Sequence, residues 1–217
     1  MGFKGILRAF TFGGLAVLVQ LGVAAASTTI VGLGDSLMAG YQLAPGESFP
    51  ERLEVALRKK GHDVAVTNAG VSGDTTSGGL ARLDWSVPDD TDLVVLELGA
   101  NDMLRGLPPE ITEKNLDTMI ARLKGRGVEV VLAGMLAAPN LGPDFAAAFN
   151  AIFPRLAEKH DIALIPFFME GVAANGGLLL ADGMHPNAEG VDRMVEIALP
   201  VVEDELGALQ SAPGGLD

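Results

Sequence analysis

The stretch Thr29-Ile30-Val31-Gly32-Leu33-Gly34-Asp35-Ser36-Leu37 decides how this chain is expected to fold. Its first five residues form an apolar run of the length and composition of a buried β-strand, and polar residues follow at once. Segments of helical period separate this run from four others. The four are Val64-Ala65-Val66-Thr67, Leu93-Val94-Val95-Leu96-Glu97-Leu98, Val128-Glu129-Val130-Val131-Leu132-Ala133 and Ile162-Ala163-Leu164-Ile165.

This alternation predicts an α/β fold in which helices cover both faces of a parallel sheet of about five strands. Several of the runs are almost continuously apolar, which is typical of strands that are buried on both faces. The chain has 217 residues, of which 48% are hydrophobic and 20% charged, and this composition suits a single domain with a sizeable core.

Helices are expected between the runs. Ser48-Phe49-Pro50-Glu51 has the form of a capping box, so the first helix begins there, and Gly61 ends it. Apolar residues at helical spacing mark further helices over residues 116–123 and 145–156, and both stripes are interpreted as core packing. A last helix runs from about Ala188 to Leu206.

The chain is expected to consist of one domain between two terminal segments. Neither an internal repeat nor a second type of composition divides residues 27–206, so they are assigned to that domain. Residues 207–217 are rich in glycine, alanine and proline and are expected to form a flexible tail.

Residues 1–26 have the pattern of a secretory signal peptide. Lys4 and Arg8 precede an apolar stretch over residues 13–23, and Ala24-Ala25-Ala26 supplies small residues for cleavage. The alternative is an uncleaved membrane anchor, but the stretch contains Gln20 and is short for a span of about 20 residues. We therefore expect a periplasmic or secreted protein with no stable membrane insertion after cleavage.

Charge and cysteine content exclude several functions. The formal net charge is −13, and cleavage after residue 26 would remove two more positive charges. Nucleic acid is excluded as a partner, because phosphate binding needs clustered lysine and arginine. The chain has no cysteine, which excludes disulfides, thiol catalysis and cysteine-ligated metals. The sequence does not indicate an oligomeric state.

Ligand sites in open α/β sheets form outside the carboxyl ends of the strands, so the loops there are the places to examine. Three loops that follow strands, and a fourth segment before the last helix, carry unusual polar groups. They are Gly34-Asp35-Ser36-Leu37, Asn68-Ala69-Gly70-Val71-Ser72-Gly73-Asp74-Thr75-Thr76, Gly99-Ala100-Asn101-Asp102 and Asp182-Gly183-Met184-His185-Pro186-Asn187.

Each segment alone has an ordinary explanation, such as a tight turn, a helix cap or a loop histidine. Together they supply the parts that acyl transfer needs. The Ser36 hydroxyl needs a base to become a nucleophile. Of the three histidines, His62 and His160 are placed at the opposite edge of the sheet, which leaves His185. Asp182, three residues upstream on a tight turn, can hold the His185 imidazole in one tautomer.

The negative charge that develops on a carbonyl oxygen needs hydrogen-bond donors fixed in advance. The backbone N–H groups of Ser36 and Gly73 and the side-chain amide of Asn101 are the candidates. Glycine at position 73 lets the backbone approach a ligand closely, and asparagine donates without adding a charge beside the base.

In these four segments the chain resembles the SGNH, or GDSL, hydrolases, and in particular their bacterial thioesterase/lysophospholipase/arylesterase branch. The resemblance covers roughly residues 28–195 and includes Pro166-Phe167-Phe168-Met169-Glu170. It implies a three-layer flavodoxin-like fold and catalysis by Ser36, His185 and Asp182, with oxyanion donors at Ser36, Gly73 and Asn101. It implies neither a metal nor an organic cofactor.

Two departures from the branch are visible. Ala100 replaces a second glycine, and the substrate loop lacks its usual aromatic residue in Leu136-Ala137-Ala138-Pro139-Asn140-Leu141-Gly142. The second departure leaves the acyl-chain preference open. The function expected is hydrolysis of small-molecule acyl esters or thioesters through an acyl-enzyme. The alternatives are a carbohydrate O-acetyl esterase on the same scaffold and a non-catalytic exported binding protein.

Overall fold

The computed structural model describes residues 1–2 and 27–211 of the chain. Its centre is one sheet of five strands, all parallel, in the order β2-β1-β3-β4-β5. This is the strand order of flavodoxin-like folds, and it confirms the predicted sheet. The strands are β1 (Thr28–Gly34), β2 (Val64–Gly70), β3 (Leu93–Glu97), β4 (Glu129–Ala133) and β5 (Ala163–Ile165).

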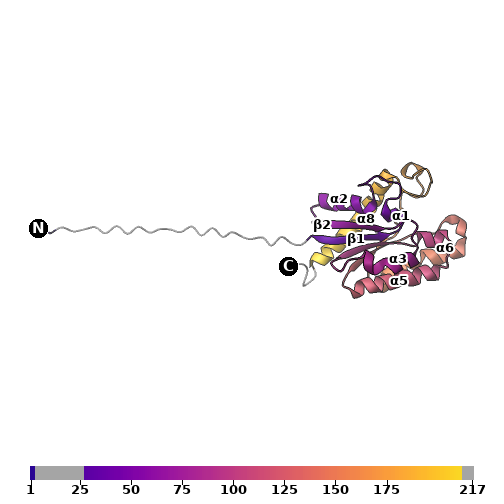
Figure 1. The fold of residues 1–217 in the computed structure, drawn as a ribbon, viewed down its shortest axis with the longest axis horizontal. Coiled ribbons are helices and arrows are strands. Elements are labelled where there is room, and N and C mark those ends of the chain that lie inside the picture. The colour runs from indigo at the N-terminus through magenta and orange to yellow at the C-terminus, as the bar shows by residue number, and fades with distance from the viewer. Residues whose placement is uncertain (3–26, 212–217) are drawn as a thin grey trace.

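Helices cover both faces of the sheet and complete the three layers (Figure 1). Helices α2 (Phe49–Lys59) and α8 (Ala188–Ser211) pack against each other on one face. Helices α3 (Thr76–Ser86), α5 (Pro109–Gly125) and α7 (Ile152–His160) cover the other. The short helical segments are α1 (Ser36–Ala39), α4 (Ala100–Leu104), α6 (Pro143–Asn150), η1 (Pro139–Leu141) and η2 (Gly176–Leu178).

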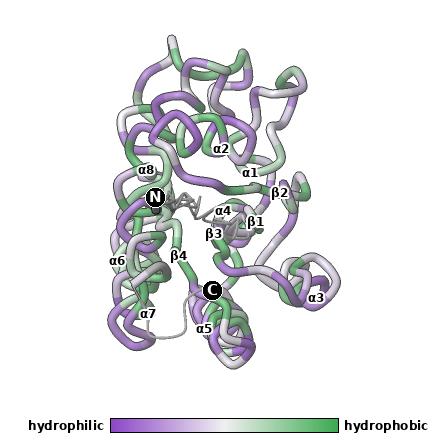
Figure 2. Tube along the Cα trace, turned by 90° about the vertical axis from the view of Figure 1, so that its left-hand side faces the viewer, coloured by the Kyte–Doolittle hydropathy of each residue, from purple (hydrophilic) through white to green (hydrophobic). Residues whose placement is uncertain are grey.

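The core lies on both faces of the central strands. All five residues of β3 are buried, and hydrophobic segments gather along β3 and β4 between the helices (Figure 2). Burial of apolar surface of this kind is the main force that holds such a sheet together. Because all strands are parallel, their carboxyl ends lie at one edge, which in Figure 1 is at the arrowheads on the right of the sheet.

The signals for the first helix are confirmed. The Glu51 carboxylate accepts a hydrogen bond from the Ser48 N–H at 3.1 Å, which completes the reciprocal capping box. After the helix ends, Gly61 has a φ of 96°, in the left-handed region that favours glycine.

The single helix expected over residues 145–156 is wrong, because the chain forms two helices, α6 and α7, divided at Ala151. Pro154 explains the division, since it has no N–H to bond the carbonyl of Asn150 one turn earlier. The side chain of Asn150 accepts a hydrogen bond from the Ala137 N–H at 2.7 Å. This hydrogen bond fastens the end of α6 to the loop after β4.

The last helix also ends later than predicted. Helix α8 continues through Gly207 to Ser211, so the boundary placed between residues 206 and 207 falls inside the helix. Leu209 packs against the core, and a single glycine costs a helix only about 1 kcal/mol. Residues 212–217 and most of the predicted signal segment, residues 3–26, lie outside the described residues. Within the described part, none of the helices is long and apolar enough to cross a membrane.

Candidate active site

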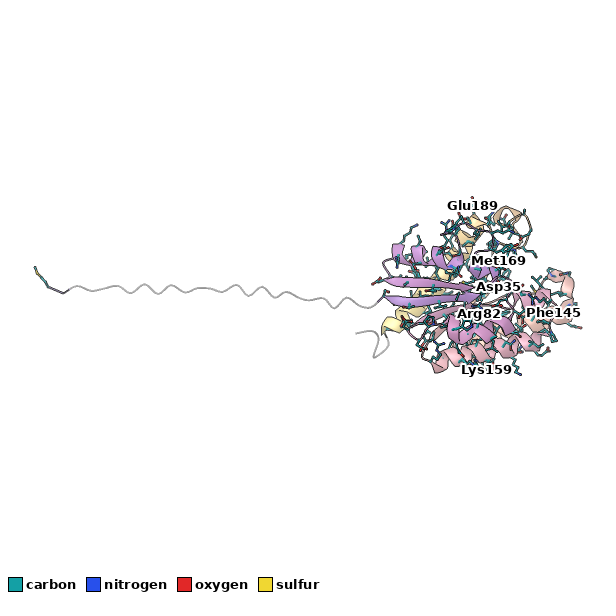
Figure 3. All side chains as sticks on the ribbon, in the orientation of Figure 1. Asp35, Arg82, Phe145, Lys159, Met169 and Glu189 are labelled. Atoms are coloured by element: carbon teal, nitrogen blue, oxygen red, sulfur yellow. The ribbon has the colours of Figure 1, made fainter. Side chains whose placement is uncertain are left out.

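The polar segments predicted from the sequence meet at the carboxyl edge of the sheet. In Figure 3, Asp35 is labelled at the arrowhead ends of the strands, with Met169 and Arg82 labelled at the same end. Asp35 follows β1 directly, and Asn101 belongs to α4, which begins three residues after β3. The topology therefore brings together residues that are far apart in the chain.

Ser36 stands at a sharp turn between β1 and α1. Asp35 caps the helix, and its Oδ1 accepts a hydrogen bond from the Leu37 N–H at 3.0 Å. Gly40 then ends α1 in a left-handed conformation, with a φ of 77°. Ser36 is the first residue of a one-turn helix, so its N–H has no partner within that helix.

His185 connects Ser36 with Asp182. Its Nε2 lies 2.9 Å from Ser36 Oγ, and its Nδ1 lies 2.7 Å from Asp182 Oδ2. The other carboxylate oxygen of Asp182 accepts hydrogen bonds from the backbone N–H groups of Met184, at 2.9 Å, and of His185, at 3.0 Å. These hydrogen bonds favour the charged carboxylate and lower the pKa of Asp182 to about 2. An ionised Asp182 in turn holds the proton of His185 on Nδ1 and leaves Nε2 free to accept one.

The other two histidines lie elsewhere, as expected. His62 Nε2 is 3.2 Å from Glu203 Oε1, and His160 Nε2 is 2.6 Å from Asp117 Oδ1. Each is paired with a carboxylate of a covering helix, and neither lines the cavity beside Ser36.

Two of the candidate oxyanion donors, Asn101 and Gly73, differ in where they lie relative to the cavity beside Ser36. Asn101 lines the cavity beside Ser36, and its Nδ2 donates one hydrogen bond to Asp35 Oδ2 at 2.8 Å. An amide nitrogen has two hydrogens, so the second stays available for a ligand. Gly73 is exposed, with a φ of 84°, and it is not among the residues that line the cavity. Its carbonyl accepts a hydrogen bond from Arg105 Nη2 at 2.7 Å, which fixes that loop.

A mostly apolar cavity of about 650 Å³ opens beside Ser36 and His185. Four methionines contribute to it, and methionine is a flexible side chain that adapts to ligands of irregular shape. A cavity of this size accommodates a ligand of drug-like dimensions. Its hydrophobic lining consists of Leu37, Ala100, Met103, Leu104, Met135, Leu136, Ala137, Ala138, Pro139, Phe167, Met169, Ala173 and Met184. Within residues 27–211 the histidine and carboxylate side chains form no cluster that could hold a metal ion.

Comparison with known proteins identifies the family of the chain. Residues 33–193 match the model of the GDSL-like lipase/acylhydrolase family. The chain belongs to that family. It is 45% identical over 165 residues to the arylesterase of Vibrio mimicus, which covers 76% of this chain and 82% of the relative.

Two further relatives cover more of the sequence or the fold. The thioesterase 1/protease 1/lysophospholipase L1 of Escherichia coli K12 is 35% identical over 210 residues, 94% of this chain and 99% of that protein. The crystal structure of TesA superposes with a TM-score of 0.78 at 37% identity, covering 82% of this chain and 99% of that one. This GDSL-family protein is accordingly a serine ester hydrolase with the fold of the SGNH hydrolases.

The sequence did not reveal every residue that supports the site of this hydrolase. The ring of Tyr41 packs on the imidazole of His185, and the buried Glu97 carboxyl accepts a hydrogen bond from the Asp35 N–H at 3.1 Å. Tyr41 lies five residues after Ser36 and Glu97 ends a strand beside Gly34, so their positions alone pointed to the site edge. What they contact depends on the folded loops.

Two further acidic residues hold the loops around the site. Asp102 is buried and accepts hydrogen bonds from both the N–H and the hydroxyl of Thr76, at 2.7 and 2.5 Å. Asp74 pairs with the Arg82 side chain, with Oδ2 2.6 Å from Nε. The guanidinium of Arg82 also donates to the carbonyls at the ends of β1 and β2, Gly34 and Ala69.

Proposed function

We propose that this hydrolase cleaves acyl esters or thioesters in two steps, with Ser36 as the nucleophile, His185 as the base and Asp182 as its partner. The observation that carries the proposal is the continuous line of contacts from Asp182 Oδ2 through His185 to Ser36 Oγ, at 2.7 and 2.9 Å. Both distances are within hydrogen-bond reach, which a base needs in order to take the proton of the nucleophile.

In the first step His185 accepts the Ser36 proton while Oγ attacks the carbonyl carbon of the substrate. The proton then passes to the leaving alcohol or thiol, and an acyl-enzyme remains on Ser36. In the second step water attacks the acyl carbonyl and gives a proton to His185. His185 then returns this proton to Ser36 Oγ as the bond between Oγ and the acyl carbon breaks, which releases the carboxylic acid and restores the free enzyme. In both steps the imidazole has to be neutral in order to act as the base.

The side-chain amide of Asn101 and the backbone N–H groups of Ser36 and Gly73 are the proposed donors to the oxyanion. For Asn101, support comes from its place in the cavity wall and from its fixed hydrogen bond to Asp35. For Gly73, support comes from its position in the loop after β2 and from the fastening of its carbonyl by Arg105. Donors that are already fixed need no reorganisation as charge develops.

The proposed substrates are small molecules that carry a hydrophobic acyl group. An apolar cavity next to the nucleophile favours an acyl chain over a glycan, because sugar hydroxyls would be buried there without partners. An arylesterase and a thioesterase/lysophospholipase are among the relatives, which supports both ester and thioester bonds.

We also propose that residues 1–26 direct export to the periplasm or beyond and are removed. The support is the pattern of Lys4, Arg8, the apolar stretch and the three alanines. The first strand begins at Thr28, so cleavage after Ala26 would leave the sheet intact. Amino-terminal sequencing of the protein from a periplasmic fraction tests this, and an amino terminus at Met1 there would contradict it.

The decisive experiment is covalent labelling with a fluorophosphonate. The Ser36→Ala variant should fold normally, lose labelling and lose about 10⁴-fold or more in kcat. Ser77→Ala, which changes an exposed serine of α3, is the matched control and should label as the unchanged protein does. Labelling that persists in Ser36→Ala, at any other residue, would refute the assignment.

A substrate panel tests the chemical class. It should include p-nitrophenyl esters from acetate to palmitate, an acyl-CoA, a lysophospholipid and an O-acetylated glycan. The proposal expects turnover of esters or thioesters with hydrophobic acyl groups. Turnover confined to the acetylated glycan would favour the carbohydrate esterase, and binding without any hydrolysis would favour an exported binding protein.

A further inference from the structure

A second carboxyl group lies directly behind the turn that carries Ser36. Glu97 is the last residue of β3 and is completely buried, and it pairs in register with Gly34 of β1. Its Oε2 accepts a hydrogen bond from the Asp35 N–H at 3.1 Å. A Cβ atom on Gly34 would lie only 2.5 Å from this oxygen, so the carboxyl packs directly against the backbone of the turn.

The other oxygen of Glu97 has no ordinary donor. Oε1 is buried, and no N–H or hydroxyl of the described residues bonds to it. The Asp35 carboxyl is buried as well, but both of its oxygens have N–H donors, at Leu37 and Asn101, so a negative charge is better supported on Asp35 than on Glu97. Burial, and next the charge of Asp35, raise the pKa of the Glu97 carboxyl well above its usual range. A proton therefore resides on Glu97.

Asp35 connects this neutral acid to the proposed reaction site. Its Oδ1 accepts from the Leu37 N–H at 3.0 Å and lies 3.5 Å from Ser36 Oγ, and its Oδ2 accepts from Asn101 Nδ2 at 2.8 Å. A buried charge needs partners of this kind on every side. Glu97 lies behind Asp35 on the side facing the core, where its Oε2 accepts from the Asp35 N–H.

We propose that Glu97 is a positioning residue, whose buried carboxyl group holds Asp35 and, through Asp35, the Asn101 amide beside Ser36. The proposal rests on the proposed function of Ser36 and Asn101. Glu97 itself does not line the cavity and touches no substrate. It acts by accepting a hydrogen bond from the Asp35 backbone N–H and by placing no second negative charge beside the Asp35 carboxylate.

Ionisation of Glu97 would place two negative charges side by side in the core. The charged groups that face the pair are His185, which acts on Asp35 from the cavity side, and Arg82 of α3, which donates to the Gly34 carbonyl at 2.8 Å. Arg82 is already paired with Asp74. Repulsion between the two carboxylates should therefore displace Asp35 and Asn101 as the pH rises, and kcat should fall on the alkaline side.

The Glu97→Gln variant tests whether the side chain at position 97 has to be uncharged. Glutamine can still accept from the Asp35 N–H with its amide oxygen, and it stays neutral at every pH. We expect kcat within about threefold of the unchanged enzyme at neutral pH, and no alkaline decline in kcat between about pH 7 and pH 10.

Glu97→Ala and Glu129→Gln complete the comparison. Glu97→Ala should lower kcat about 100-fold with a smaller change in KM. The reason is that a misplaced hydrogen-bond donor stabilises the transition state less well but has little effect on substrate binding. Glu129 lies at the amino end of β4, at the opposite edge of the sheet, and its Gln variant should keep the alkaline decline. If Glu97→Ala does not fold, the pH profile of Glu97→Gln decides the question alone.

Two results would overturn the proposal. One is a Glu97→Gln profile that superimposes on that of the unchanged enzyme, and the other is a Glu97→Gln kcat as low as that of Glu97→Ala. Fluorophosphonate labelling of the unchanged enzyme shows whether such a result concerns Glu97 alone or the proposed function of Ser36 as well. If Ser36 labels but the profiles coincide, only the role of Glu97 is wrong, whereas absence of labelling at Ser36 removes the function itself.

Discussion

The ring of Tyr41 packs against the imidazole of His185, with the ring centroids 4.4 Å apart and the planes inclined by 38°. Tyr41 follows α1, only five residues after Ser36, and Gln42 Nε2 donates to its hydroxyl at 3.0 Å. His185 is therefore held by Asp182 at one nitrogen and by Tyr41 across one face of the ring. An aromatic contact of this type contributes about 1 kcal/mol beyond the area it buries.

Tyr41→Ala should lower kcat/KM about fivefold, because the imidazole loses the contact that limits its rotation. Tyr41→Phe keeps the ring and should stay within about twofold of the unchanged enzyme. Steady-state kinetics with one p-nitrophenyl ester compare the two. Equal loss in both variants would show that the hydroxyl, and not the ring, is what matters.

Asp182→Asn should lower kcat by about 10²- to 10⁴-fold, because asparagine cannot stabilise the imidazolium and can hold the ring in the wrong tautomer. In the unchanged enzyme the pKa of Asp182 is about 2, so its ionisation should not shape the pH profile of activity above about pH 4. A second acidic step in the profile at higher pH, present only while Asp182 is intact, would contradict this.

The same pKa predicts how stability depends on pH. A carboxyl whose pKa is lower in the folded state stabilises the fold above its ordinary value, here 3.8, and loses that effect as the pH falls toward about 2. The difference in Tm between the unchanged protein and Asp182→Asn should therefore shrink between about pH 4 and pH 2. Calorimetric scans across that range measure it, and a constant difference would count against the assignment.

Asn101→Ala should lower kcat about 100-fold while KM changes little, as expected when a donor to the oxyanion is removed. The Asp35 carboxylate would also lose a partner at 2.8 Å, so the Tm should be measured alongside the kinetics. Asn115→Ala is a suitable control, because Asn115 donates to two hydroxyl groups of α3, away from the cavity lining. A parallel loss of kcat in both variants would indicate a general disturbance of the fold.

Ala173→Leu should shift the acyl-chain preference toward short esters. Ala173 lines the cavity and is exposed, so a larger side chain can enter the cavity without disturbing the core. Filling part of an apolar site changes selectivity by about 1 to 3 kcal/mol, so kcat/KM for palmitate should fall at least about fivefold relative to acetate. Ala174→Leu changes the neighbouring exposed residue, outside the cavity lining, and should leave the ratio unchanged.

Arg82→Ala should destabilise the fold by about 3 kcal/mol or more, because it leaves Asp74 and two strand-end carbonyls without their donor. Urea unfolding at neutral pH measures the change. Arg122, which is half exposed and lies 3.7 Å from an exposed Asp84, serves as the matched control. Its Ala variant should change the free energy of unfolding by no more than about 1 kcal/mol.

Much of the fold followed from local pattern. Each apolar run became a strand, because a segment that is apolar on both sides has to be covered on both faces. Two predicted helix boundaries were wrong. Pro154 divided the helix predicted over residues 145–156, and Leu209 found core contacts that extended α8 beyond Leu206. A periodic stripe shows that a helix face is buried, but the ends of helices depend on backbone partners and tertiary contacts.

The residue types at the candidate site were determined by the sequence itself, because acyl transfer needs a nucleophile, a base and donors, and only one histidine stood at the correct edge of a parallel sheet. Only the tertiary structure decided that Ser36 and His185, 149 positions apart, lie 2.9 Å from each other. It also decided that Tyr41 packs on the imidazole and that the buried Glu97 accepts a hydrogen bond from the Asp35 N–H. Contacts across such separations depend on how loops close over the strand ends and how much water they exclude, and these properties belong to the packed chain as a whole.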